Sequence, residues 1–368
     1  MAADTKPRAE TKFGIVYNGW HCLVTGEGKP APHNIAEALS GRRPWGPIPE
    51  FHYWAEPADG YYCLGERPDL LRRHAEELRE AGIDFIVFDA TNNPFADART
   101  PDSQRGVMEP FQRLVEVWSQ VPGAPKVVPW APLTSDGTMF EWMLDRLKAQ
   151  PGLFFSLNGK PLALVTEAAQ TFHTDSDKEK ALSRSYTIRR MWGLSNESKN
   201  WSFLSPCQRG FLATQARIPC RQKHAVRDGT PEQISIAVAY QETYASYKAT
   251  AVPKFQGRTF IRQFETLASL PKVQVALISG WNEWMAQRFC LSSPTQVTWE
   301  NCTVDNDHWP DGTKVFVDDY DVEYSRDIEP SKEWPYDFYL RLMSHCIRKF
   351  REGGMCAEGE VRLPPRTR

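Results

Sequence analysis

The residue best suited to acid–base chemistry is Glu283, which lies between two indole side chains in a Gly-Trp-Asn-Glu-Trp segment. A carboxylate held between Trp281 and Trp284 is partly removed from water, and this desolvation raises its pKa. A raised pKa suits a general acid that protonates the leaving oxygen of an acetal. Asn282 is expected to bind a sugar hydroxyl or to orient the carboxylate. The structural alternative is a buried Glu283 paired with an arginine such as Arg288.

Hydrolysis of an acetal by this chemistry needs a second carboxylate. Asp89 follows the apolar run 83–88 and is expected to project into the same site from a strand end, or else to hydrogen-bond the loop that follows. Glu242 comes just after the apolar run 234–239, where it either joins the site or begins a helix, since glutamate favours a first helical turn. We expect Glu283 to act as the acid and Asp89 or Glu242 as the nucleophile or base.

Aromatic rings and amides are the side chains that hold sugars, and this chain contains 13 Trp, 12 Tyr and 19 Phe. Many of them fall in predicted loops or at predicted strand ends. The side chains expected to contact a substrate are Trp281, Asn282, Trp284, Asn18, Trp20, Asn92, Trp130, Tyr240, Asp319, Trp54, Glu56 and His52. The alternatives are structural: the indoles close the core, the histidine lies on the surface, and Asp319 pairs with Arg326.

Apolar runs that alternate with helical patterns must position these side chains. The predicted strands cover residues 13–17, 83–88, 126–130, 161–165, 186–191, 234–239, 273–278 and 314–317. The predicted helices cover 68–81, 104–120, 137–149, 259–269 and 336–351, and a turn is expected at 157–160. This alternation favours an α/β fold, a single-domain (β/α)8 TIM barrel whose active site lies at the C-terminal ends of the strands. The expected divisions are a flexible N-terminus at 1–11, a catalytic barrel with long loops at 12–352, and a tail at 353–368.

Charge and composition exclude several function classes. The 44 Lys and Arg nearly balance the 46 Asp and Glu, which argues against a nucleic-acid partner or a basic membrane-binding surface. No apolar run approaches the length of a membrane-spanning helix. No Cys-x-x-Cys or His-x-x-x-His spacing indicates zinc, and we expect neither a metal nor another cofactor. The sequence does not predict an oligomeric state.

Eight cysteines fall into local pairs, although eight allow about 105 pairings and the sequence does not fix the connectivity. Three sequons occur, at Asn196, Asn200 and Asn301. The paired cysteines and the sequons together favour an oxidising compartment and a secreted, disulfide-bonded glycoprotein. The alternative is a cytosolic protein with free thiols. The N-terminus has no apolar signal region, which we interpret as a trimmed start. The pairs suggested by proximity are Cys22 with Cys63, Cys207 with Cys220, Cys290 with Cys302, and Cys346 with Cys356.

Three segments resemble the glycoside hydrolase family 99-like proteins, which include endo-α-mannosidases and barrel domains from bacterial O-antigen and capsule clusters. They are residues 278–284 (Ile-Ser-Gly-Trp-Asn-Glu-Trp), residues 81–89 and residues 158–161 (Asn-Gly-Lys-Pro). The resemblance implies a (β/α)8 barrel that acts on glycans, with a catalytic glutamate aligned on Glu283. The endo-mannosidases of that group carry a second glutamate three residues further on, where this chain has Ala286, so their two-glutamate mechanism does not transfer.

The sequence therefore predicts a secreted glycoside hydrolase that cleaves an oligo- or polysaccharide with carboxylate acid–base chemistry. Ala286 motivates the alternative of a barrel that binds carbohydrate without cleaving it, because the loss of one carboxylate abolishes hydrolysis and leaves the binding surface intact.

Overall fold

The computed structural model describes residues 10–28, 34, 36–37, 40–44, 51–92, 96–166, 174–193, 199–204, 224–241, 245–246, 251–288, 290–293, 296–298, 316–318 and 322–366. The predicted site residues Glu242 and Asp319 lie outside these ranges, as do three of the cysteines and two of the sequons. Those are Cys207, Cys220, Cys302, Asn196 and Asn301.

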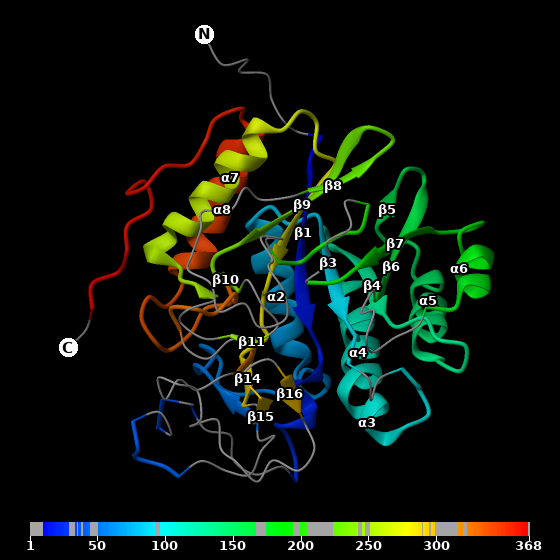
Figure 1. The fold of residues 1–368 in the computed structure, drawn as a ribbon, viewed down its shortest axis with the longest axis horizontal. Helices are drawn as coiled ribbons and strands as arrows, with labels where there is room; N and C mark the ends of the chain where they lie inside the picture. The colour runs from blue at the N-terminus through cyan, green and yellow to red at the C-terminus, as the bar shows by residue number, and fades with distance from the viewer. Residues whose placement is uncertain are drawn as a thin grey trace.

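A curled, mostly parallel sheet forms the centre of the molecule (Figure 1). Seven of its strands run parallel, in the spatial order β7–β6–β4–β3–β1–β13–β9. They are β1 (Lys12–Asn18), β3 (Phe85–Asp89), β4 (Lys126–Ala131), β6 (Lys160–Thr166), β7 (Thr187–Met191), β9 (Thr230–Ala237) and β13 (Val275–Ser279). Two antiparallel strands complete the sheet, β5 (Ser156–Leu157) beside β6 and β8 (His224–Arg227) beside β9. Seven of the eight predicted strands are therefore confirmed as members of one sheet.

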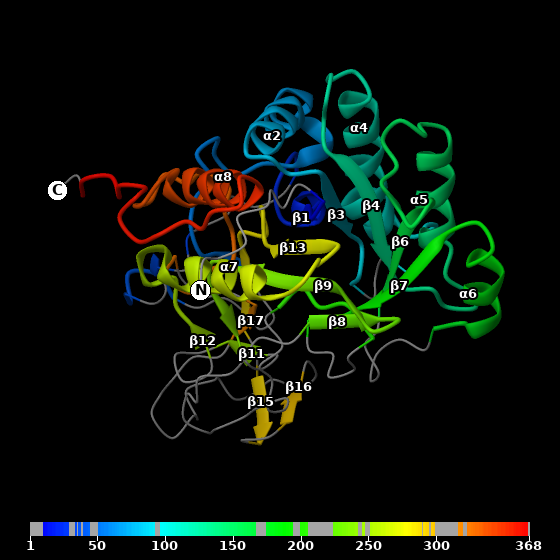
Figure 2. The same ribbon diagram turned by 90° about the horizontal axis from the view of Figure 1, so that it is seen from above.

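Helices cover the outer face of this sheet, as the view along the strands in Figure 2 shows. They are α2 (Pro68–Glu80), α4 (Glu109–Trp118), α5 (Met139–Lys148), α6 (Ser176–Leu182), α7 (Arg258–Ser269) and α8 (Phe338–Arg351). Phe13 of β1 illustrates the packing, because its ring contacts Phe264 of α7 at 6.0 Å and Phe350 of α8 at 5.7 Å. The shorter helical turns are α3 (Pro101–Ser103), η1 (Trp20–Leu23), η2 (Leu64–Glu66), η4 (Gln104–Met108) and η5 (Phe255–Gly257). Among the described residues no helix is long and apolar enough to cross a membrane.

Alternation along the strands divides the apolar side chains into two cores. Ile15 and Ile86 belong to the larger core, which lies between the sheet and the helices. Their neighbours Val16 and Val87 belong to a second core on the concave face of the sheet. Side chains two positions further along, at the C-terminal strand ends, therefore point into the mouth of the curled sheet.

Residues Trp201 and Ser202 join β7 to β9, between which the described residues show no strand ladder. Trp201 donates its backbone N–H to the Arg190 carbonyl of β7 at 2.9 Å. On the other side, Gln233 of β9 donates from Nε2 to the Ser202 carbonyl at 2.7 Å. The sheet is thus barrel-like, with a side-chain seam at the place where the predicted barrel would close.

One predicted strand, 314–317, is not part of the central sheet. The corresponding strand β17 (Phe316–Asp318) pairs antiparallel with β11 (Ala245–Ser246) and β14 (Met285–Arg288), and β14 pairs with β2 (Phe51–Tyr53). A three-residue apolar run carries no information about its partners, so alternation alone placed it wrongly. Four further short strands form two hairpin-like pairs, β10 (Tyr240–Gln241) with β12 (Ala251–Val252) and β15 (Cys290–Ser293) with β16 (Gln296–Thr298).

Candidate functional site

Three predicted site residues stand side by side at the C-terminal edge of the sheet. Asn18 of β1 is in register with Asp89 of β3, and Asp89 is in register with Trp130 of β4. Their side chains point to the concave face, because they follow Val16, Val87 and Val128 by two positions and these valines line the concave core. Asp89 thus lies on the face of the sheet that the prediction for it requires.

Asp89 is partly exposed and also has the structural role that the sequence left open. Its Oδ1 accepts the backbone N–H of Thr91 at 2.8 Å, which orders the loop after β3. The neighbouring Asn92 is exposed at the surface of that loop. Asp89 therefore both shapes the rim and presents a carboxylate to the site.

Glu283 lies just after β13 and forms an ion pair with a buried arginine. Arg326 Nη2 lies 2.7 Å from Glu283 Oε2, and the two side chains are 2% and 12% exposed. The alternative of a Glu283 paired with an arginine is therefore present, with Arg326 from a segment far along the chain as the partner. The side chain of Arg288 lies outside the described residues. A guanidinium at this distance stabilises the negative carboxylate. Glu283 therefore fits a base or nucleophile better than the general acid that the sequence predicts.

A second carboxylate holds the backbone at the same place. Asp327 Oδ1 accepts the Glu283 N–H at 2.6 Å, and its Oδ2 accepts the Trp284 N–H at 3.1 Å. Burial raises the pKa of Asp327 above its ordinary value, and the two backbone donors act in the opposite direction. Because both of its oxygens are occupied and the side chain is buried, Asp327 supports the site rather than lining it.

Asn282 is fully buried and joins β1 to the loop after β13. Its Oδ1 accepts the Asn18 N–H at 2.8 Å, and its Nδ2 donates to the Asn18 carbonyl at 3.1 Å. His21 Nε2 donates to the Asn282 carbonyl at 2.6 Å, and burial lowers the pKa of His21 to about 3, so this ring is neutral. Of the two roles expected for Asn282, the structure supports orientation of the loop.

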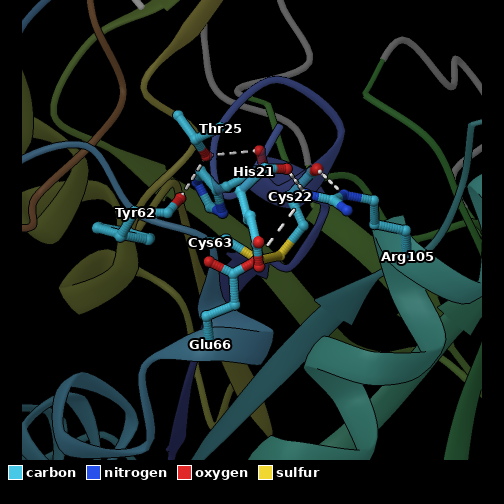
Figure 3. The surroundings of a disulfide bond; sticks show 8 residues. His21, Cys22, Thr25, Tyr62, Cys63, Glu66 and Arg105 are labelled. Carbon is cyan, nitrogen blue, oxygen red and sulfur yellow. Dashed lines mark hydrogen bonds and ion pairs between the residues drawn. A yellow bond between two sulfur atoms is a disulfide. The ribbon is translucent and has the colours of Figure 1, made fainter. Parts of the chain in front are cut away.

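A disulfide lies next to His21, which makes one of these contacts, and next to Tyr62 (Figure 3). Cys22 is bonded to Cys63, and Thr25 Oγ1 beside them donates to the carbonyls of His21 and Tyr62 at 2.7 and 2.6 Å. Tyr62 in turn accepts from Asn282 Nδ2 at 3.2 Å. The cross-link therefore restrains two side chains that hold the site loop.

A buried polar network continues beneath Trp284. Glu329 accepts from the Trp284 indole, from the Tyr62 hydroxyl at 2.8 Å and from His74 Nε2 at 2.6 Å. The other ring nitrogen of His74, Nδ1, pairs with the hydroxyl of Tyr17 at 2.7 Å. The network links β1, α2 and the loop that carries Glu283.

Five predicted tryptophans are placed in the core. Trp54 stacks on Trp284 with ring centroids 4.7 Å apart, and the Trp281 ring meets His74 edge-on at 5.5 Å. The exposed fractions of Trp20, Trp54, Trp130, Trp281 and Trp284 are 7%, 3%, 1%, 0% and 0%. What these indoles supply directly in this structure is packing, which is the structural alternative stated for them.

Two partly exposed aromatic rings lie near Trp130 and Arg326, and from the sequence only one of them, Trp192, is a stacking candidate. Phe203 is partly exposed, lies 5.2 Å from Trp130 and has the Arg326 guanidinium 5.8 Å from its ring. Trp192, also partly exposed, lies 6.1 Å from Phe203. Neither residue belongs to a strand in which apolar and polar residues alternate, so no sequence pattern marks Phe203. Trp192 is indicated only by its position in a predicted loop.

The remaining predicted contacts lie on the rim. Glu56 binds Lys332 at 2.5 Å, which ties the loop after β2 to the surface rather than to the carboxylates. The backbone of His52 pairs with that of Ala286 in the second sheet. Tyr240 lies in β10 and is partly exposed. In the described part of the chain, no group of three or more His, Cys, Asp or Glu side chains is arranged to hold a metal ion.

Two solved structures of one enzyme share this architecture over most of their length. The GH99 endo-α-mannosidase from Bacteroides thetaiotaomicron in complex with BIS-TRIS-propane aligns over 92% of this chain and 97% of its own, with a TM-score of 0.52 and 10% sequence identity. Another structure of that endo-α-mannosidase covers 92% and 98%, with a TM-score of 0.51 and 12% identity. The chain has the GH99 fold. No protein-family model and no curated protein matches its sequence.

Two predicted disulfides are present in this chain, Cys22–Cys63 and Cys346–Cys356, with Cα–Cα distances of 4.3 and 4.9 Å. They are compatible with an oxidising compartment. The sequon at Asn200 is different, because Asn200 is only 8% exposed and Ser202 is 5% exposed. A glycan on Asn200 would therefore have to displace packed side chains of the folded chain.

Glu77 lies one helical turn from His74 in the GH99-type core, and burial raises its pKa to about 6. The folded state therefore binds more protons than the unfolded state between pH 4.5 and 6, so stability falls as the pH rises through this window. We expect Glu77→Gln to increase the free energy of unfolding at pH 7 by up to about 2 kcal/mol and to have no effect below pH 4. Urea unfolding at both pH values measures this, with the exposed neighbour Glu76→Gln as the control. Equal effects of the two substitutions at pH 7 would contradict the prediction.

Proposed function

We propose that this chain is a secreted glycoside hydrolase that cleaves a bond within an oligo- or polysaccharide. The observation that carries the proposal is the position of two partly exposed carboxylates, Asp89 and Glu283, at one edge of the sheet. Asp89 is in register with Asn18 of β1, and Asn18 is hydrogen-bonded to Asn282 beside Glu283. The two carboxylates therefore lie on the two sides of β1, at the end of the sheet where the active sites of this architecture lie.

The ion pair with Arg326 supports the following assignment of roles. Glu283, held in its charged form, acts as the nucleophile toward the anomeric carbon or as the base that removes a proton from the attacking water. We assign proton donation to the leaving oxygen to Asp89, with Glu242 as the other candidate from the sequence. Hydrolysis then adds one water across the bond, with the hydroxyl on the anomeric carbon and the proton on the leaving sugar.

The substrate is held by aromatic rings and by polar atoms at the mouth of the curled sheet. Phe203 and Trp192 are partly exposed and suit the apolar face of a sugar ring. Asn18 Oδ1, Trp130 Nε1 and Thr166 Oγ1 are buried at the C-terminal strand ends and have no hydrogen-bond partner among the residues that the structure describes. Buried polar groups are rarely left unpaired, so these atoms are suited to sugar hydroxyls or to ordered water between protein and sugar.

The choice of sugar is a separate matter. The structural neighbours are named endo-α-mannosidases, so α-mannosides are the first substrates to test. The resemblance of the sequence implies a second glutamate at the position of Ala286, which lies in β14, where its backbone pairs with His52 and Asp318. This difference supports a pairing of Glu283 with a carboxylate from another strand and leaves the linkage open.

The test is hydrolysis of a panel of fluorescently labelled oligosaccharides, α-mannosides first, by the wild-type chain and by Asp89→Asn. We expect cleavage of at least one member by the wild type and a loss of about 100-fold or more in kcat for Asp89→Asn, because proton donation is removed. Asp145→Asn, an exposed aspartate on α5, is the matched control and should retain full activity.

Two outcomes would count against the proposal. Full activity of Asp89→Asn would remove Asp89 from the reaction and direct attention to Glu242. Binding of an oligosaccharide without any cleavage by the wild type would favour a carbohydrate-binding barrel, the function for which Ala286 and the fully paired Glu283 are the supporting observations.

A further inference from the structure

Five consecutive buried residues, 325–329, lie against the loop that carries Glu283, and we call them the clamp segment. None of them is more than 6% exposed. The backbone N–H groups of Ile328 and Glu329 donate to the Trp281 carbonyl at 3.2 and 2.9 Å. At Gly280 the approach is closest, because a Cβ there would lie 2.7 Å from the Arg326 carbonyl oxygen. The clamp segment and the loop are thus in direct backbone contact.

Two neighbouring residues of the clamp segment hold different parts of Glu283. Arg326 binds the carboxylate of the side chain at 2.7 Å. Asp327 binds the backbone N–H at 2.6 Å, while Ser325 Oγ accepts the Asp327 N–H at 3.0 Å and fixes the clamp itself. One short segment therefore holds both the backbone and the side-chain carboxylate of Glu283.

The turn at Glu283 and Trp284 needs a carboxylate, because two backbone N–H groups there require two acceptor oxygens. Trp284 has a φ of 55°, a left-handed conformation that is costly for a bulky residue and persists only where the surroundings enforce it. Asp327 meets this need because its two oxygens accept the N–H groups of Glu283 and Trp284. An amide would offer one acceptor and one donor, and its NH₂ group would face a backbone N–H.

Two cations lie near the carboxylate of Asp327. Arg326 and Lys254 are the cations whose fields act on its carboxylate. Lys254 is itself buried, with its ammonium 4.5 Å from the Tyr339 ring and 5.5 Å from the Trp54 ring. Removal of the Asp327 charge would thus change both the hydrogen bonds and the charge balance behind Glu283.

We propose that Asp327 is a positioning residue for the hydrolysis assigned above, which fixes the backbone of Glu283 while Arg326 fixes its carboxylate. The inference rests on the proposed function for its kinetic consequence, and on the geometry alone for its structural one. It separates two effects, because Asp327 controls where the carboxylate is and Arg326 controls how strongly it is held in the charged form.

The kinetic test compares Asp327→Asn and Arg326→Met with the wild type on the substrate that the wild type cleaves. Asp327→Asn is expected to lower kcat by 10- to 100-fold, with KM within twofold and no movement of the acidic limb of the pH profile to higher pH, because the variant loses a negative charge near Glu283 and keeps Arg326. Arg326→Met is expected to move that acidic limb to higher pH, because the Glu283 carboxylate loses its cation. Asp337→Asn, an exposed aspartate before α8, is the control for an aspartate-to-asparagine change in the same part of the chain.

Assays run well below the unfolding temperature of each variant separate positioning from stability. A kcat for Asp327→Asn within twofold of the wild type would overturn the inference, and so would a change confined to KM. A substitution that merely weakened the fold would lower the unfolding temperature and leave both the pH profile and the kcat of the folded fraction unchanged.

Amide hydrogen exchange provides a readout that does not depend on activity. The amides of Glu283 and Trp284 are expected to exchange at least tenfold faster in Asp327→Asn than in the wild type, with no such change in Asp337→Asn. If no glycoside is cleaved but these amides lose protection, the proposed function fails and the clamp stands. If their exchange is unchanged, the clamp inference fails whatever the chain hydrolyses.

Discussion

Glu283→Gln is expected to lower kcat/KM by about 10³-fold on any glycoside that the wild-type chain cleaves. Glutamine has nearly the same size and can still accept a hydrogen bond from Arg326, so the loop and its contacts should persist. What is lost is the negative charge, and with it the ability to attack the anomeric carbon or to take a proton from water. Release of labelled sugar under saturating and subsaturating substrate measures the effect.

The matched control for this prediction is Glu265→Gln, an exposed glutamate on α7. It should leave kcat/KM within a factor of two. A Glu283→Gln variant that folds and retains more than a tenth of the wild-type kcat/KM would exclude the role assigned to Glu283. Glycan binding equal in both proteins, with hydrolysis in neither, would instead point to the binding barrel.

Glu232→Gln is expected to lower the free energy of unfolding by about 3–5 kcal/mol, the usual cost of removing one partner from a buried ion pair. Glu232 is 1% exposed and accepts from Arg189 Nη2 at 2.6 Å and Nε at 2.8 Å, and from the Trp201 indole at 2.9 Å. Burial acts to raise its pKa, but these donors outweigh it and hold the pKa below its ordinary value. The effect is large because Glu232 spans the seam between β7 and β9.

Chemical denaturation at neutral pH measures this loss, and two further variants define its origin. Arg227→Ala removes only a more exposed contact, 3.4 Å from Glu232, and should cost less than about 1 kcal/mol. Replacing Glu232 and Arg189 together by leucine should recover much of the stability, because no buried charge is then left unpaired. An effect of Glu232→Gln below 1 kcal/mol would show that the seam does not depend on this pair. Because the folded pKa is lowered, the contribution should also disappear as the pH falls below about 4.5.

The fold could be predicted where one strand or helix carries its own signal. The run 83–88 is long enough and apolar enough to be a strand buried on both faces, and the structure has β3 there. Asn158 and Gly159 have φ values of 55° and 79°, which is why an Asn-Gly pair predicted the turn between β5 and β6. The run 314–317 lacked such information, since its partners in the second sheet come from distant parts of the chain.

The site could be predicted in outline but not in its contacts. Strand-end logic placed Asp89 and Glu283 at one edge, because that depends only on where each strand stops. Arg326 could not be found this way, since it is 43 residues from Glu283 and belongs to no strand or helix. The tryptophans were predicted to contact substrate, but the structure buries five of them, for a related reason. Loops that pack across one another bury a tryptophan as completely as a strand does, and only the tertiary structure shows which ring remains exposed.

The clamp segment also has a consequence for the folding of the chain during translation. Translation proceeds from the N-terminus, and the partners of the site loop are 220 to 264 residues apart from it in sequence, at Tyr62 and Asn18. Most of the sheet is synthesised before Glu283 exists, yet Glu283 has neither its arginine nor its aspartate until residue 327 has emerged. The nascent chain can thus acquire a nearly complete sheet before the Glu283 loop has these partners, and the hydrolysis proposed above would require one of the last buried segments to dock first.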